Sequence, residues 1–161
     1  MNSTAHELIT HLQLVKHPEG GYFREIFRSP TVISRHALPQ GHRGDRSIMT
    51  SIYFLLPSEE VSRFHRLKSE ELWFFHSGSP LTVTLIDNDG QSNQQILGEN
   101  QFQMAIPANT WFAASVNNPK SYTLVSCVVA PGFDFQDFEL ASQEWLLKIF
   151  PQHSNLIILL T

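Results

Sequence analysis

Residues 65–78 carry the side chains best suited to acid–base chemistry. The segment consists of two largely apolar runs joined at residues 68–70. Because side chains alternate across a strand, His65 shares a face with Leu67, and Glu71 shares a face with Trp73 on the next strand. A tight turn between the runs then brings His65 and Glu71 together. The sequence therefore predicts a histidine–carboxylate pair at the mouth of a hairpin, with Asp134 as an alternative carboxylate for His65.

A histidine–carboxylate pair of this kind has three interpretations. It satisfies two buried polar groups by hydrogen bonding, it contacts a ligand without chemistry, or it transfers a proton. In the last case His65 is the general base, and Glu71 fixes the tautomer of the ring and stabilises its charged form. The residues alone leave these three interpretations open.

Short strands are the elements that must position the pair. Runs rich in β-branched and aromatic residues are separated by turn signals, and no helical pattern lies between them. The runs span residues 21–27, 50–56, 61–67, 71–76, 81–86, 102–107, 110–116 and 122–130. Strands at this spacing predict an all-β antiparallel sandwich or barrel. One domain over residues 1–161 is expected, because no linker, repeat or low-complexity run divides the chain.

Helical patterns flank the strands at both ends of the chain. Thr4 and Glu7 have the spacing of a capping box, and apolar residues follow at helical intervals. A second helix is expected after Ser142, with Pro151 as its stop. The apolar tail at 155–160 is far shorter than the ~20 residues that cross a bilayer. It is expected to form a terminal strand or a docking segment.

The bulk composition excludes several classes of function. The chain has 161 residues and a net charge of −4, and its basic residues are scattered, so it carries no nucleic-acid footprint. The N-terminus lacks the pattern of a signal peptide. The single cysteine, Cys127, lies in an apolar run and fits a reducing, cytoplasmic compartment. The expected partners are a small molecule and a second copy of the chain, with no nucleic acid and no membrane.

The segment 65–78 resembles the first motif of the cupin superfamily. That motif contains two histidines two residues apart, then a glutamate, then a glycine. His65, Glu71 and Gly78 match it, whereas Leu67 stands where the second histidine belongs. The resemblance implies a double-stranded β-helix, the jelly-roll barrel of the cupins.

The second cupin motif is matched only in part, at residues 106–112. Pro107 agrees with its proline, but Phe112 or Trp111 stands at the position of its histidine. Metal-binding cupins hold their ion with three histidines and one carboxylate, and two of these four positions are kept here. No metal and no other cofactor is therefore expected, and a metal-dependent enzyme is the less favoured alternative.

A second resemblance covers nearly the whole chain. It is similar to the small cupin family called cupin-5, a domain of unknown function. The matching segments are residues 17–29, 51–56, 64–75, 106–114, 124–141 and 150–153. This resemblance implies a compact cupin barrel and a tendency to form homodimers, but no established reaction.

The cupin-5 fold resembles that of the deoxysugar-nucleotide epimerases, which suggests a function. In those enzymes a histidine–carboxylate pair removes a proton next to a ketone, and a tyrosine returns one from the other face. The resemblance implies a metal-independent epimerase or isomerase acting on a phosphorylated or nucleotide-sugar-like ligand. His65 and Glu71 would then be catalytic, with Tyr53 as the first candidate for the tyrosine. The alternative is a small-molecule sensor or carrier without catalysis.

Further ligand-binding candidates lie on the neighbouring strands. Tyr22 and Arg24 share a strand face that suits an anionic ligand, although Arg24 is equally suited to a surface ion pair. Trp73 and Trp111 are expected in the core or in the lining of the pocket. Gln103 alternates with apolar neighbours and points either inward, as a specificity contact, or outward to solvent.

The barrel mouth is expected to have two covering segments. The polar loop 36–46 is either a lid or a solvated loop. Phe133, Phe135 and Phe138 are expected to form a packing cluster, and Asp137 among them is expected to cap or hydrogen-bond a turn.

Overall fold

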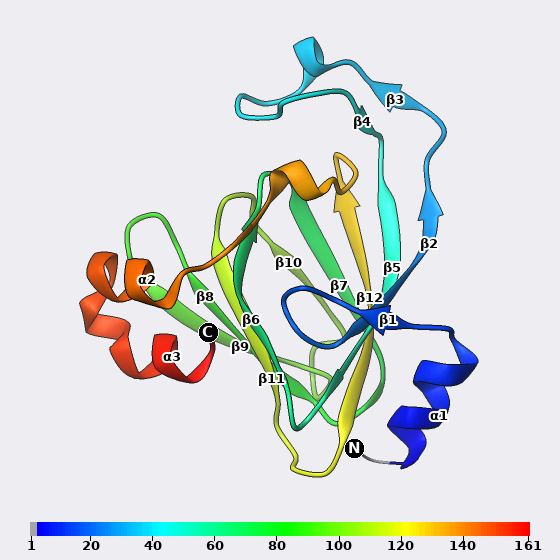
Figure 1. The fold of residues 1–161 in the computed structure, drawn as a ribbon, viewed down its shortest axis with the longest axis vertical. Coiled ribbons are helices and arrows are strands. Elements are labelled where there is room, and N and C mark those ends of the chain that lie inside the picture. The colour runs from blue at the N-terminus through cyan, green and yellow to red at the C-terminus, as the bar shows by residue number, and fades with distance from the viewer. Residues whose placement is uncertain (1–2) are drawn as a thin grey trace.

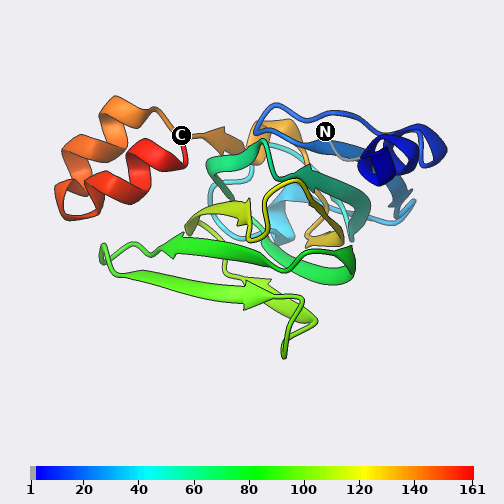
Figure 2. The same ribbon diagram turned by 90° about the horizontal axis from the view of Figure 1, so that it is seen from below.

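The computed structural model describes residues 3–161, and two antiparallel sheets that face each other dominate it (Figures 1 and 2). The six-stranded sheet has the order β1 (Val15–Lys16), β2 (Tyr22–Arg28), β5 (Thr50–Pro57), β12 (Tyr122–Ala130), β7 (Glu70–Gly78) and β10 (Gln103–Ile106). The five-stranded sheet has the order β13 (Phe138–Leu140), β6 (Val61–Leu67), β11 (Trp111–Val116), β8 (Leu81–Ile86) and β9 (Ser92–Leu97). The expected jelly-roll barrel is confirmed.

Alternation along the strands fills the space between the two sheets. Inward residues from both sheets form one buried cluster, in which Phe54, Trp73 and Phe112 are the largest members, each at most 2% exposed. Every apolar run that predicted a strand is a strand in the structure. Strand β11 is buried on both faces, because its outer face packs against the C-terminal segment.

Strands β9 and β13 are among those that were not predicted. The residues of β9 are mostly polar and exposed, and the strand is held at the edge of its sheet by pairing with β8 from Leu81↔Leu97 to Ile86↔Ser92. The short strand β13 pairs with β6, and this pairing sets Leu140 opposite His65. Neither strand has the apolar pattern that sequence reasoning depends on.

Helices lie on opposite sides of the barrel, with α1 on one side and α2 and α3 on the other (Figures 1 and 2). In α1 (Ser3–His11), Thr4 lies inside the helix rather than at its cap. Ser142 caps α2 (Gln143–Ile149) as expected, because its hydroxyl accepts a hydrogen bond from the Trp145 amide. Within residues 3–161 no helix is long and apolar enough to span a membrane.

The apolar tail docks on the barrel as a helix, not as a strand. In α3 (Ser154–Leu159) the side chain of Ile157 is fully buried in a cluster with Phe64 and Trp111. The amide of Phe64 also donates a hydrogen bond to the carbonyl of Leu160, at 2.9 Å. The tail therefore covers the outer face of the five-stranded sheet.

An arm extends beyond one end of the barrel (Figure 1). It consists of the ribbon β3 (Val32–Ile33) and β4 (Arg46–Ser47), with the 3-10 turn η1 (Arg35–Ala37) between them. The loop in this arm is not simply solvated, since His42 is 4% exposed and its Nε2 lies 3.3 Å from the hydroxyl of Ser69.

Candidate functional site

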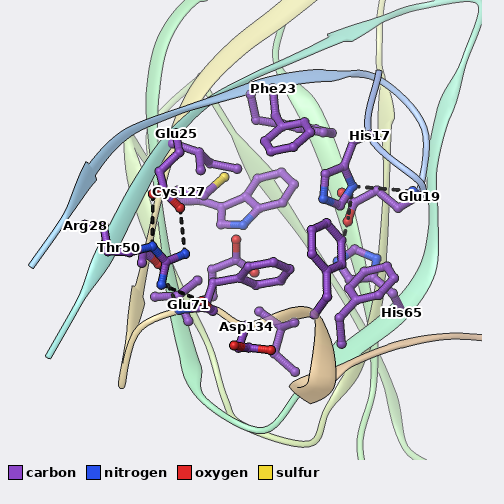
Figure 3. Close-up of a pocket in the computed structure, with 18 residues that line it drawn as sticks. His17, Glu19, Phe23, Glu25, Arg28, Thr50, His65, Glu71, Cys127 and Asp134 are labelled. Atoms are coloured by element: carbon purple, nitrogen blue, oxygen red, sulfur yellow. Dashed lines mark hydrogen bonds and ion pairs between the residues drawn. The ribbon is translucent and has the colours of Figure 1, made fainter. Parts of the chain in front are cut away.

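A cavity of about 250 Å³ opens at one end of the barrel, between the two sheets (Figure 3). Strand alternation accounts for most of its lining, because residues two apart on each strand point into it. These are Phe23 and Glu25 on β2, Ile52 and Phe54 on β5, His65 and Leu67 on β6, Glu71 and Trp73 on β7, and Cys127 and Val129 on β12. His65, Glu71 and Trp73 therefore line one common cavity.

Glu19 is the carboxylate that contacts His65, which corrects the predicted pairing with Glu71 or Asp134. Its Oε2 lies 3.1 Å from Nε2 of His65 and 3.1 Å from Nδ1 of His17, and its Oε1 accepts a 2.8 Å hydrogen bond from the hydroxyl of Ser62. The side chains of Glu19 and His65 are 7% and 3% exposed. Figure 3 shows Glu19 between the two imidazoles on one wall of the cavity.

The backbone, rather than a carboxylate, fixes the tautomer of His65. Its Nδ1 lies 2.7 Å from the carbonyl oxygen of Arg63. Because a carbonyl only accepts, Nδ1 carries the proton of this contact, and the lone pair of a neutral ring lies on Nε2, facing Glu19. Phe112 packs on the ring with centroids 4.0 Å apart and holds its plane. His65 is therefore oriented from both sides.

Burial sets the charges of this pair. It lowers the pKa of His65 and outweighs the opposing effects of Glu19 and the Arg63 carbonyl. For Glu19, burial alone would raise the pKa, but His65, His17 and Ser62 together lower it. At neutral pH the pair is thus an uncharged imidazole beside a carboxylate. A proton that arrives between Nε2 and Oε2 would be held by both groups, which is the behaviour of a general base.

A tight turn over residues 17–21 brings Glu19 to His65. The amide of Gly20 bonds the carbonyl of His17, and the amide of Arg63 on β6 donates to the carbonyl of Glu19 at 2.9 Å. Gly20 has φ +117°, and a Cβ on it would lie 2.1 Å from the carbonyl oxygen of Val61. Only glycine fits this approach. The two glycines that follow Glu19 are the sequence signal that could have indicated this turn.

Glu71 lies on β7, in the other sheet from His65, and has a different environment. It is 6% exposed, and burial, reinforced by the charge of Glu19, raises its pKa to about 8. The indole N–H of Trp73 and the thiol of Cys127 face the carboxyl group and oppose this rise. At neutral pH Glu71 is mainly a carboxylic acid, so it can donate a hydrogen bond.

Charged and aromatic side chains surround the cavity mouth. Arg28 is bound by both carboxylate oxygens of Glu25, at 3.0 and 2.7 Å, and by the carbonyl of Phe133 (Figure 3). The predicted phenylalanine cluster is confirmed, with Phe133 and Phe135 at a centroid distance of 5.0 Å. Phe135 also stacks on His17 at 6.2 Å, so the cluster forms part of the cavity lining.

The structure places five predicted site residues outside this cavity. Tyr53 lies on the opposite face of β5, with its ring 5.9 Å from that of His76. Tyr22 stacks under Lys16, and Arg24 bonds the carbonyl of Leu12. Gln103 points outward to solvent, and Trp111 packs in the cluster under the C-terminal helices. Alternation explains Tyr53, because Ile52 and Phe54 on either side of it face the cavity.

The donor set does not fit a metal. The four cupin ligand positions hold His65, Leu67, Glu71 and Phe112, and the two apolar side chains have no lone pairs to offer. Across residues 3–161 no group of three or more His, Cys, Asp or Glu side chains is arranged to hold a metal ion. Nε2 of His65 instead contacts Oε2 of Glu19 directly, at 3.1 Å.

Comparisons with known proteins agree with this architecture. A protein of known crystal structure from Shewanella oneidensis is 38% identical, with a TM-score of 0.86 over 100% of this chain and 98% of that one. A hypothetical protein from Leishmania major is 34% identical, with a TM-score of 0.88 over 100% and 99% of the two chains. An uncharacterised protein of Saccharomyces cerevisiae is 31% identical over 91% of this chain and 79% of its own length.

A more distant likeness concerns the fold alone. Oxalate decarboxylase from Bacillus subtilis is 17% identical and matches with a TM-score of 0.56 over 91% of this chain and 36% of that one. The family model of the cupin superfamily designated DUF985 (Cupin_5) matches residues 6–141. The chain belongs to this cupin family.

Proposed function

We propose that this cupin binds a small carbonyl compound in its barrel cavity and catalyses metal-independent proton transfer, as an isomerase or epimerase does. The observation that carries the proposal is the 3.1 Å contact between Nε2 of His65 and Oε2 of Glu19, buried inside the cavity. An imidazole that is uncharged at neutral pH can accept a proton on Nε2, and the neighbouring carboxylate stabilises the charged ring that results. That arrangement suits the removal of a proton from carbon next to a carbonyl group.

The proposed step balances without a cofactor. The C–H bond next to the carbonyl breaks, its proton goes to Nε2 of His65, and its electron pair moves into the carbonyl to form an enolate. The carboxylate of Glu19 stabilises the imidazolium that results. Return of a proton to the opposite face of the same carbon epimerises it. Where that carbon carries a hydroxyl group, the enolate becomes an enediol by proton exchange between its oxygens, and a proton returned to the former carbonyl carbon isomerises the compound. Tyr53 has no part in this step, because it lies on the outer face of β5.

The charges of the lining favour an uncharged ligand over the phosphorylated one expected from the sequence. Among the described residues that line the cavity, Arg28 is the only arginine or lysine, and Glu25 already neutralises it. Glu19 and Asp134 add negative charge to the same lining. A phosphate group would therefore have to lie outside the cavity mouth. The support for a nucleotide sugar is correspondingly weak.

Deuterium exchange tests the proposal. The protein is incubated in D2O with cyclohexanone, dihydroxyacetone and dihydroxyacetone phosphate, and loss of the signal of hydrogen next to the carbonyl is followed by proton NMR. Exchange above the uncatalysed rate is expected with at least one neutral probe. It should fall roughly 100-fold or more in His65→Gln and Glu19→Gln, the usual contribution of a general base.

His76→Gln is the matched control for the exchange experiment. His76 is an exposed histidine on β7 that bonds the hydroxyl of Ser126 on the outer face of the sheet. Its replacement should leave exchange unchanged. An equal loss in all three variants, or no exchange with any probe, would contradict proton transfer. Binding without exchange would instead favour the sensor or carrier, which the aromatic lining also suits.

A further inference from the structure

The indole N–H of Trp73 is an unsatisfied donor in the cavity wall. Trp73 is 1% exposed, and within residues 3–161 its Nε1 is the one buried side-chain nitrogen or oxygen that makes no hydrogen bond of normal geometry. Buried polar groups are almost always paired, because leaving one unpaired costs about 1–3 kcal/mol. The indole N–H faces the carboxyl group of Glu71 without making a normal hydrogen bond to it, so an acceptor bound in the cavity can take its hydrogen bond.

Glu71 lies beside this donor. Both side chains come from β7, two residues apart, and line the cavity. Figure 3 shows the Glu71 side chain among the residues that line it. The register of the sheet sets Val129 opposite Glu71 and Cys127 opposite Trp73, so an apolar residue and a thiol flank the two polar groups. Desolvation favours the uncharged acid form of a carboxyl group in such surroundings. The acid form supplies a second donor next to the indole.

The donors and the proposed base come from opposite walls. Trp73 and Glu71 belong to the six-stranded sheet, whereas His65 belongs to the five-stranded sheet and receives Glu19 from the 17–21 turn. A ligand lying between the sheets would therefore meet hydrogen-bond donors on one side and a proton acceptor on the other. A carbonyl compound matches this division, because its oxygen accepts hydrogen bonds while the neighbouring carbon loses a proton.

We propose that Trp73 and Glu71 form a donor pair that holds the carbonyl oxygen of an uncharged ligand. The inference rests on the proposed function for the site and adds the class of ligand and the atom that is held. As the enolate forms, negative charge develops on this oxygen, and two donors aimed at it stabilise that charge. A carboxylate ligand meets an uncompensated Glu19 and is disfavoured, and an ammonium ligand has no acceptor position to fill at the donor pair.

Three probes with the same ring test the ligand class directly. Cyclohexanone, cyclohexylammonium and cyclohexanecarboxylate are titrated into the protein at pH 7, and binding is followed by backbone amide NMR. Cyclohexanone is expected to bind at least tenfold more tightly than either charged probe, with shifts at residues of β7. Tighter binding of a charged probe, or no binding of cyclohexanone, overturns the proposal.

Variants separate the donor pair from general packing. Trp73→Phe keeps a ring and removes the N–H, so it should weaken cyclohexanone binding roughly 5- to 30-fold, the effect of one lost hydrogen bond. Glu71→Met should do the same, whereas Glu71→Gln keeps an N–H donor and should retain affinity. Trp111→Phe is the matched control, because Trp111 is equally buried but lies in the cluster outside the cavity. Equal losses in Trp73→Phe and Trp111→Phe overturn the proposal.

A measurement on the unaltered protein covers the case in which a variant fails to fold. As pH rises through about 8, Glu71 loses its proton, and its donor becomes an acceptor. Cyclohexanone affinity should therefore fall above that pH, and affinity that stays constant to pH 9.5 contradicts the proposal. The other titratable groups lining the cavity are His17, Glu19, Glu25, Arg28, His65, Cys127 and Asp134.

These tests fail separately from the test of the proposed function. Binding of cyclohexanone is an equilibrium readout that needs no proton transfer, and deuterium exchange is a rate. If His65→Gln abolishes exchange while Trp73→Phe leaves cyclohexanone affinity unchanged, the role of His65 as a base is supported and the donor pair is contradicted. If the Trp73 and Glu71 variants weaken cyclohexanone binding as expected but no probe exchanges its hydrogen, the donor pair is supported and the proposed proton transfer is contradicted.

Discussion

Arg46 and Asp137 form a bidentate ion pair that ties the arm of the protein to the segment covering the cavity. Nε and Nη2 of Arg46 donate to the two carboxylate oxygens of Asp137, at 2.6 and 2.9 Å, and both side chains are at most 4% exposed. Asp137 is the last residue of the 3-10 turn η2 (Phe135–Asp137). Phe135 in this turn and Phe138 directly after it line the cavity. No residue of loop 36–46 lines the cavity, and the arm is instead joined to the segment beside the cavity by this ion pair.

Breaking this pair from one side should be costly. Arg46→Met leaves a buried carboxylate without its partner, so the free energy of unfolding should fall by about 3–5 kcal/mol. Urea denaturation followed by tryptophan fluorescence measures this change. The control is Glu139→Gln, which removes the partly exposed partner of Arg66 and should cost less than about 1 kcal/mol. Equal effects of the two changes would contradict the importance assigned to burial.

The raised pKa of Glu71 predicts how stability depends on pH. The pKa is about 8 in the folded protein against an ordinary value of 4.5, so the folded state holds this proton more tightly. Its contribution to stability is fully present below about pH 4.5, falls as pH rises toward 8, and is lost above 8. Glu71→Gln removes the titration. The variant should therefore gain stability relative to the unaltered protein between pH 5 and pH 9, by a few kcal/mol.

Urea midpoints of both proteins at pH 5, 7 and 9 measure this difference. Glu25→Gln serves as a control, because Glu25 is exposed and ion-paired with Arg28 at the mouth. Parallel pH profiles for the unaltered protein and Glu71→Gln would show that Glu71 is ionised throughout this range.

The fold was predictable because its signals are local. A strand such as β12 has a long apolar run, and β-branched and aromatic residues pack well on a pleated surface. The polar strand β9 was not predictable, since it exists through its pairing with β8 and not through its own composition. The C-terminal tail was uncertain for a related reason. A tail of six residues, five of them apolar, fits a strand or a helix equally well, and burial of Ile157 against Phe64 decides between them.

The site was predictable only where alternation along single strands builds it. His65 on β6 and Glu71 and Trp73 on β7 line the cavity as alternation predicts, but the predicted hairpin was wrong, because β6 and β7 belong to different sheets. The partner of His65 is 46 positions earlier in the chain, and no local pattern joins Glu19 to it. Long-range pairing of the 17–21 turn with β6 creates that contact.

Gly20 should be essential to the position of Glu19. A Cβ in Gly20→Ala would overlap the backbone carbonyl of Val61 at 2.1 Å, so the 17–21 turn has to move. Gly41→Ala is the matched control. Gly41 has a similar φ of +108°, but a Cβ there would meet only the side chain of Lys68 at 3.7 Å. Gly41→Ala therefore measures the cost of the strained backbone alone, which should lower the free energy of unfolding by about 1–3 kcal/mol.

Two readouts test the Gly20 prediction. The urea midpoint should fall further in Gly20→Ala than in Gly41→Ala, because overlap adds to the strain. The NMR signals of the His65 ring should also change in Gly20→Ala alone, since the contact with Glu19 is disturbed. A His65 ring whose titration is unaltered in Gly20→Ala would show that the turn does not position the carboxylate.

The C-terminal helix offers two neighbouring isoleucines that differ only in burial. Ile157 is 0% exposed against the barrel, and Ile158 is 59% exposed. Ile157→Ala leaves a cavity beneath Trp111 and should lower the free energy of unfolding by about 2–5 kcal/mol, whereas Ile158→Ala should change it by less than about 0.5 kcal/mol. Denaturant unfolding of both variants makes the comparison. Because α3 covers the outer face of the five-stranded sheet, away from the cavity, cyclohexanone affinity should be the same in both folded variants; a weaker affinity in Ile157→Ala would mean that the tail also shapes the site.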